Sequence, residues 1–142
     1  MNKKIVLCLI YNQNQILLQL RNLNSRTIHP GTWGYFSGMV KINENPKNAI
    51  KRELYEELRI ISFKELKLVF QYYDEKTKSN YFIYIMKSLI KKFKLCEGLD
   101  LCFFKSYELF KKKKSKKMDR YFNCADSRLM KIFFNKCKKN FF

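Results

Sequence analysis

The sequence of 142 residues contains very little glycine, proline and histidine. It has 4 Gly, 2 Pro and 1 His, and its 12 Asp plus Glu face 30 Lys plus Arg. So little Gly and Pro excludes a collagen-like or linker-rich chain. A hydrophobic fraction of 46% is too high for a chain that stays disordered, so we expect a folded core. The length suits a single domain, which we predict over residues 1–142.

Long apolar runs are also missing. The longest stretch without a charge, residues 5–20, has polar residues at its centre. It is shorter than the about 20 apolar residues that a membrane-spanning helix needs. The apolar run near the N-terminus is at the lower limit for a signal peptide and lacks a small-residue cleavage site, so a buried strand explains it better. We therefore expect a cytoplasmic protein with no membrane partner.

Cysteine occurs without a recognisable pattern. The 5 Cys include no C-x-x-C pair, and His29 is the single histidine. This pattern argues against a disulfide framework and against a zinc finger. It is typical of reduced, buried thiols in a cytosolic protein.

The net charge of +18 has two interpretations. A basic chain can bind nucleic acid, and the segment Lys111–Lys117 consists of Lys around one Ser. Alternatively, the charge reflects an AT-rich gene, because Phe, Ile, Lys, Asn and Tyr supply 70 of the 142 residues. We favour the second interpretation. Each Gly, Pro or Arg then carries more information than usual, and half of the Gly, Ala, Pro and Arg fall between Pro30 and Arg52.

Hydrophobic periodicity predicts an α+β fold. Strands are expected at Lys4–Tyr11, Gln15–Leu20, Trp33–Phe36, Ile61–Tyr73, Tyr81–Lys87 and Leu101–Lys105, with a short strand at Met39–Lys41. Helices are expected at Pro46–Leu58, Ser106–Phe110 and Asp126–Lys138. In the first helix, Asn45 is a good N-cap, and Ile50, Leu54 and Leu58 form one apolar stripe. This order of elements predicts an α+β or an α/β/α layered domain with a mixed sheet.

The scarce acidic residues gather on the helix Pro46–Leu58. Glu53, Glu56 and Glu57 lie within about a 100° arc of it. They repel one another at these spacings, and they stand in the half of the helix where the macrodipole disfavours negative charge. A solvated acidic face is the simpler interpretation. A divalent cation such as Mg²⁺, which prefers carboxylate oxygens, is the alternative, and the geometry leaves both open.

Two residues before the helix add to the metal interpretation. Gly38 ends a glycine-rich stretch, where the backbone can approach a ligand closely. Glu44 lies just before the helix. Its charge favours the helix N-terminus, and it could also brace Arg52 or complete a metal site.

These residues together resemble the Nudix box. The sequence has Gly38, five residues, Glu44, seven residues, and then the run from Arg52 to Ile60, RELYEELRI. The family pattern is G-x5-E-x7-R-E-U-x-E-E-x-G-U, in which U is a bulky aliphatic residue. Eight of the nine defined positions match, and Arg59 stands where the family has Gly. That Gly usually ends the helix in a left-handed conformation, which costs another residue about 1–2 kcal/mol.

The resemblance to the Nudix hydrolases implies a Nudix-like α/β/α sandwich and a metal-dependent reaction. The reaction is hydrolysis of a nucleoside diphosphate linked to another group, with Mg²⁺ as cofactor and Mn²⁺ as the alternative ion. Glu53, Glu56 and Glu57 would bind the metal, together with the carbonyl of Gly38.

The resemblance also implies catalytic roles. Arg52 would orient the carboxylates by pairing with Glu56 or Glu44. Glu53 is the first candidate for the general base, and Glu97 is a candidate from a later loop. The expected catalytic residues are therefore Glu53, Arg52 and Glu44.

Substrate choice depends on residues outside the box. Arg21 is either a phosphate ligand or an exposed loop charge. Trp33, like Tyr72, Tyr73 and Tyr84, could stack on a base, although ordinary packing is favoured. We expect a small nucleotide-type diphosphate, either a nucleoside triphosphate or a nucleotide sugar. The alternatives are an RNA-end pyrophosphohydrolase, a basic nucleic-acid-binding module and a ligand-sensing relative without turnover. A homodimer is compatible with the sequence.

Overall fold

The computed structural model describes residues 2–24 and 30–105. They form two compact units, which we describe separately. The first contains residues 2–10 and 36–97, and the second contains residues 11–24, 30–35 and 98–105. His29, the segment Lys111–Lys117 and the two helices predicted after Lys105 lie outside the described residues. The single domain over residues 1–142 stays a prediction.

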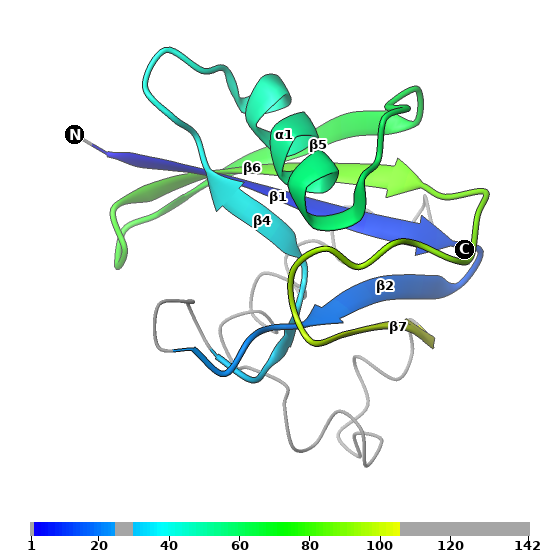
Figure 1. Ribbon diagram of the computed structural model, residues 1–142. Coiled ribbons are helices and arrows are strands. Elements are labelled where there is room, and N and C mark those ends of the chain that lie inside the picture. Colours follow the sequence, from blue (N-terminus) through cyan, green and yellow to red (C-terminus); the bar gives the residue numbers. More distant parts are fainter. Residues whose placement is uncertain (1, 25–29, 106–142) are drawn as a thin grey trace. The chain divides into compact units, whose positions relative to one another are not determined.

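The first unit combines one helix with four strands. The strands are β1 (Lys3–Asn12), which enters this unit with its residues up to Ile10, β4 (Phe36–Met39), β5 (Leu66–Asp74) and β6 (Ser79–Lys87). Strand β1 pairs with β6 and, antiparallel, with β4, and β6 pairs antiparallel with β5. The arrows of β1 and β6 point the same way in Figure 1, so the sheet is mixed. The predicted α+β class is confirmed.

Helix α1 (Pro46–Leu58) has the predicted bounds. The side chain of Asn45 accepts a hydrogen bond from the amide of Asn48 at 2.8 Å, which satisfies one of the unpaired donors at the helix start. Ile50, Leu54 and Leu58 are buried as expected. Figure 1 shows α1 lying across one face of β1, β4 and β6, so this stripe packs against the sheet.

The end of α1 retains the left-handed conformation although the usual Gly is replaced. Arg59 has φ 56° and ψ 32°. Its amide donates to the carbonyl of Tyr55 at 2.9 Å, and its guanidinium lies 4.9 Å from the centroid of the Tyr55 ring. Such a cation–π contact contributes about 0.5–1 kcal/mol, which offsets part of the about 1–2 kcal/mol of backbone strain.

Strands β5 and β6 form the predicted hairpin. Tyr72 is paired with Tyr81, and the turn between the strands contains Lys78 at φ 49°. The predicted start of β5 at Ile61 is wrong, because pairing with β6 begins only at Leu66. Residues 61–65 form a loop and turn, in which Ile61 is 82% exposed.

The second unit is built around β2 (Gln15–Leu20). This strand pairs antiparallel with β3 (Trp33–Gly34) and with β7 (Asp100–Lys105). The predicted strand Trp33–Phe36 is wrong as one element, because β3 pairs with β2 whereas β4 pairs with β1. The strand predicted at Met39–Lys41 is also wrong, since β4 ends at Met39.

Two further findings concern only the described part of the chain. None of its helices is long and apolar enough to cross a membrane. Cys8, Cys96 and Cys102 are free thiols, and burial raises the pKa of Cys8.

Candidate active site

Arg52 is the centre of a polar cluster on α1. Its Nε donates to Oε1 of Glu44 at 2.9 Å, and its Nη2 donates to Oε2 of Glu44 and to the carbonyl of Met39, both at 3.0 Å. A guanidinium that grips a carboxylate with two parallel bonds is held in a fixed orientation. Arg52 therefore ties the helix to the loop that precedes it.

The remaining nitrogen of Arg52 points to the acidic residues of α1. Nη1 donates to Oε1 of Glu53 at 2.5 Å and to Oε2 of Glu56 at 3.4 Å. The sequence predicted a partner at Glu56 or Glu44. The structure brings Arg52 to both and adds Glu53.

Local charge and burial shift the acidity of this cluster in opposite directions. The hydrogen bonds from Arg52, followed by the amide of Lys41, lower the pKa of Glu44 from 4.5 to about 2. Glu44 in turn raises the pKa of Arg52. Burial raises the pKa of Glu53, which outweighs the opposing effect of Arg52.

Gly38 lies directly beside Glu53. A Cβ atom at position 38 would overlap the carboxyl carbon of Glu53. Gly38 is held on β4, where its register partner is Val6 of β1. The backbone of Gly38 and the Glu53 carboxylate, expected together from the sequence, are therefore neighbours in space.

The other two carboxylates of α1 differ in exposure. The Glu56 side chain is 42% exposed, whereas Glu57 as a residue is only 7% exposed. The charge of Glu57 adds to burial in raising the pKa of Cys8 on β1, so the Glu57 carboxylate lies on the sheet side of the helix. The three acids thus span the arc from solvent to sheet.

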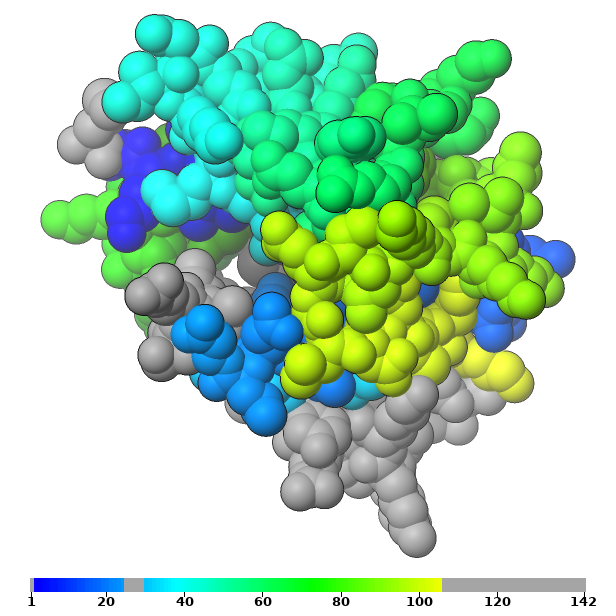
Figure 2. Space-filling view, in the orientation of Figure 1, coloured from blue at the N-terminus to red at the C-terminus, as the bar shows by residue number. Residues whose placement is uncertain are grey.

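The segment after β6 is tied to the same helix. The amide of Cys96 donates to the carbonyl of Glu57 at 2.9 Å. The next residue, Glu97, is close enough for its charge to contribute to the raised pKa of Glu53. In Figure 2 the yellow-green segment that follows β6 lies against α1, drawn in green.

The donor set fits a hard divalent cation. Glu53, Glu56 and Glu57 offer carboxylate oxygens and Gly38 offers a carbonyl, which are ligands that Mg²⁺ and Mn²⁺ accept. In residues 2–24 and 30–105, no three acidic, Cys or His side chains already converge to hold an ion. Two of the three carboxylates are instead bonded to Arg52. A cation at this site would share these carboxylates with Arg52.

The two predicted substrate residues both lie in the second unit. Arg21 is positioned by its backbone, whose amide donates to the carbonyl of Thr32 at 2.9 Å. Its guanidinium packs over Gly34, where a Cβ would come within 2.5 Å of it. Trp33 is 2% exposed and packs edge-to-face on Phe104 at 5.1 Å. For Trp33 the structure supports packing rather than stacking on a base.

Sequence reasoning missed two backbone groups of this site. The carbonyl of Met39 accepts from Arg52, and the amide of Cys96 holds the later segment on α1. Every residue carries an amide and a carbonyl, so the side-chain pattern gave no signal for either contact.

Comparison with known proteins places the fold. The family model described as NUDIX domain matches residues 1–122. A MutT NUDIX hydrolase from Burkholderia pseudomallei has a TM-score of 0.65 and 20% identity, over 92% of this chain and 97% of its own. A MutT/nudix family protein from Enterococcus faecalis has a TM-score of 0.61 and 16% identity, over 73% of this chain and 44% of its own.

A third similar structure has an activity in its name. It is a bifunctional NMN adenylyltransferase/ADP ribose pyrophosphatase from Francisella tularensis, complexed with AMP and a Mn ion. Its TM-score is 0.69 and its identity 16%, over 96% of this chain and 42% of its own. The chain thus spans less than half of the Enterococcus and Francisella proteins. Similarity to solved structures at these identities shows the fold, and the family match over most of the sequence shows more: this chain belongs to the NUDIX domain family.

Proposed function

We propose that this protein is a metal-dependent pyrophosphohydrolase. Its substrate would be a nucleoside diphosphate linked to another group, and its cofactor Mg²⁺, with Mn²⁺ as a substitute. The observation that carries the proposal is the cluster on α1. Three carboxylates gather beside Arg52 and the backbone of Gly38, in a chain with 30 basic and only 12 acidic residues.

The residues proposed to hold the cation are Glu53, Glu56 and Glu57, together with the carbonyl of Gly38. When bound, the ion would neutralise the diphosphate and make water a better nucleophile. Arg52 would orient the carboxylates, because its other edge is fixed by Glu44 and the Met39 carbonyl. Loss of Glu44 would therefore act through Arg52 rather than through the substrate.

Proton removal from the attacking water needs a positioned carboxylate, which contributes about 10²–10⁴-fold. Glu53 is the first candidate. Glu97 is the second, because the hydrogen bond between Cys96 and Glu57 holds this part of the chain on the helix. Replacing each of them by Gln distinguishes the two candidates. The variant that lacks the general base should lose the ionisation of that base from its pH–rate profile.

The substrate class is proposed to be a nucleotide sugar or a nucleoside triphosphate. A similar structure carries ADP ribose pyrophosphatase in its name and another carries MutT. Arg21 is proposed to contribute to phosphate binding in the substrate, and replacing it by Lys should raise KM more than it lowers kcat. The Lys-rich segment on which nucleic-acid binding was predicted lies outside the described residues, so no contact favours that alternative.

The experiment is product identification with the full chain. ADP-ribose, GTP and a 5′-triphosphorylated RNA are incubated separately with Mg²⁺, with Mn²⁺ and with a chelator. We expect AMP and ribose phosphate from the first, or pyrophosphate and a nucleoside monophosphate from the second. Pyrophosphate from the RNA alone would move the substrate class to RNA ends. Turnover of none of them would argue against the proposal.

The matched pair of variants is Glu57→Gln and Glu75→Gln. Both remove one negative charge, but Glu75 lies exposed in the turn between β5 and β6, away from the cluster. We expect Glu57→Gln to lower kcat by at least about 100-fold, with Glu75→Gln unchanged. Equal activity of the two would contradict the proposed metal ligands.

A further inference from the structure

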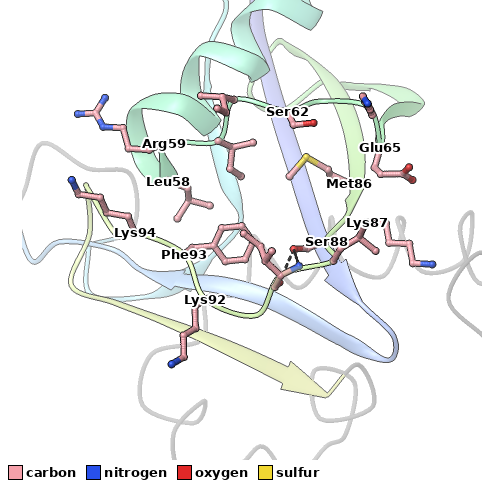
Figure 3. Close-up of a pocket in the computed structure, with 15 residues that line it drawn as sticks. Leu58, Arg59, Ser62, Glu65, Met86, Lys87, Ser88, Lys92, Phe93 and Lys94 are labelled. Atoms are coloured by element: carbon pink, nitrogen blue, oxygen red, sulfur yellow. Dashed lines mark hydrogen bonds between the residues drawn. The ribbon is translucent and has the colours of Figure 1, made fainter.

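A cavity lies at the C-terminal end of α1. Its volume is about 480 Å³, within the range of small-molecule sites. Three segments of the first unit enclose it: the end of α1 with the loop that follows, the end of β6, and the chain after β6 (Figure 3). None of the carboxylates proposed to bind metal lines it.

The floor of this cavity is apolar. Leu58 and Met86 are buried there, and the ring of Phe93 lies beside them. The hydroxyl of Ser88 donates to the carbonyl of Ile90 at 2.7 Å and accepts from its amide at 3.2 Å, so it is engaged by the backbone. Such a surface offers little to water and much to an apolar ligand.

The rim combines exposed apolar residues with positive charge. Ile61 and Leu89 are 82% and 84% exposed, and Ile90 is 57% exposed. Large exposed apolar side chains that cluster at a cavity mark interaction sites. The charged residues that line the cavity are Arg59, Lys64, Lys87, Lys92, Lys94 and Glu65. Five cations therefore surround the cavity against one carboxylate.

The charged ends stay outside the cavity. In Figure 3 the amines of Lys87, Lys92 and Lys94 point away from its centre. The guanidinium of Arg59 is stacked over Tyr55 instead. The site thus has an apolar interior and a cationic mouth, each suited to a different part of one ligand.

We propose that this cavity binds a small amphipathic anion, with its ring or acyl body inside and its acidic group at the lysine rim. Burial of the body would remove its apolar surface from water, which favours binding. A neutral apolar ligand would lose the charge interaction, and a highly charged nucleotide would find no polar partner on the floor. A cavity of this volume admits a small molecule and is too small for a folded partner.

The test uses the full chain without metal or nucleotide, so its outcome does not depend on the hydrolase proposal. The anionic probe is 1-anilinonaphthalene-8-sulfonate, with decanoate as competitor and N-phenyl-1-naphthylamine as the neutral probe. Binding is followed by fluorescence and by the NMR signal of the Met86 methyl group. We expect that signal to shift on binding and decanoate to displace the probe. A Met86 signal that stays fixed while the probe binds would overturn the proposal.

Variants separate the interior from the rim. Ile90→Trp fills the cavity from its exposed edge and should lower the affinity for both probes about tenfold or more. Lys64→Glu combined with Lys92→Glu should lower the affinity for the anionic probe about tenfold and change the affinity for the neutral probe much less. Lys76→Glu, made singly and together with Lys78→Glu, is the control, because both lysines lie in the turn at the far end of β6.

Thermal unfolding verifies that each variant is folded. An unchanged affinity in folded Ile90→Trp would overturn the proposal, and so would equal losses in the rim and control pairs. The latter result would mean that the probe responds only to the overall charge of the chain.

Discussion

The two faces of α1 are stabilised by different kinds of interaction. The face toward the sheet carries the apolar stripe, and Ile50 and Leu54 on it are fully buried. A neighbouring face is organised by one guanidinium, which bonds to Glu44, Glu53 and Glu56. The free energy of apolar burial depends on the area that is buried and not on direction. The hydrogen bonds of Arg52, in contrast, depend on the angle between donor and acceptor. The same helix is thus anchored by one face and positions chemical groups with the other.

The largest loss of stability is expected from a change on the apolar face. Leu54→Ala removes a fully buried side chain, so we expect a loss of about 2–5 kcal/mol in the free energy of unfolding. Urea denaturation measures the effect. Leu89→Ala removes the same atoms from a residue that is 84% exposed and should cost less than about 0.5 kcal/mol. Similar losses in both variants would mean that α1 is not anchored by its apolar stripe.

A change on the polar face should cause a smaller loss of stability, and a cation should restore part of it. Arg52→Ala leaves the carboxylates of Glu44, Glu53 and Glu56 without their shared donor, and we expect about 1–3 kcal/mol of destabilisation. Mg²⁺ should restore part of it, because it would neutralise the same acids. The measurement is urea denaturation with and without Mg²⁺. The control is the gain in the free energy of unfolding that Mg²⁺ gives to Leu54→Ala. If this gain equalled the gain for Arg52→Ala, the effect of Mg²⁺ would not be specific to the cluster.

Acid should reveal the contribution of Glu44. Its pKa is lowered from 4.5 to about 2 in the folded chain, so its carboxylate stabilises the fold fully above about pH 5. That contribution is lost as the pH falls from 4.5 toward 2. Glu44→Gln should therefore be less stable than the unmutated chain at neutral pH, with the difference shrinking through this window. Denaturation midpoints at several pH values measure it, and a constant difference would contradict the assigned cause.

The smallest expected effect lies at the end of α1. Arg59→Gly removes the left-handed strain and the contact with Tyr55, whereas Arg59→Ala removes only the contact. We expect the Gly variant to be more stable than the Ala variant by about 1 kcal/mol. Thermal unfolding of the pair measures the difference. Equal stability would show that the turn relaxes around alanine.

How far the sequence predicts this molecule depends on how local each interaction is. The bounds of α1 follow from Asn45, Pro46 and the apolar stripe, all of which act within the helix. The pairing of Arg52 with Glu44 and Glu56 also follows from a motif of fixed spacing, whereas its bond to Glu53 was not predicted. The start of β5 does not, because the apolar Ile61 resembles a strand residue although pairing with β6 begins at Leu66.

Features built from distant segments could not be predicted from the sequence. The hydrogen bond of Cys96 to the Glu57 carbonyl joins backbone atoms far apart in the chain. The cavity floor joins Leu58 of α1 with Met86 of β6 and with Phe93. Each of these residues resembles an ordinary core residue, and only their arrangement in space defines a site. The partner of Arg52 at the Met39 carbonyl was missed for the same reason.

The close approach of Gly38 to Glu53 also bears on where this sequence requires glycine. The chain has only 4 Gly. Asn43 and Arg59 hold a left-handed backbone, with φ 64° and φ 56°, although neither is Gly. At these two positions a side chain costs backbone strain. At position 38 a single added carbon would collide with the Glu53 carboxylate, so replacing Gly38 would displace a proposed metal ligand.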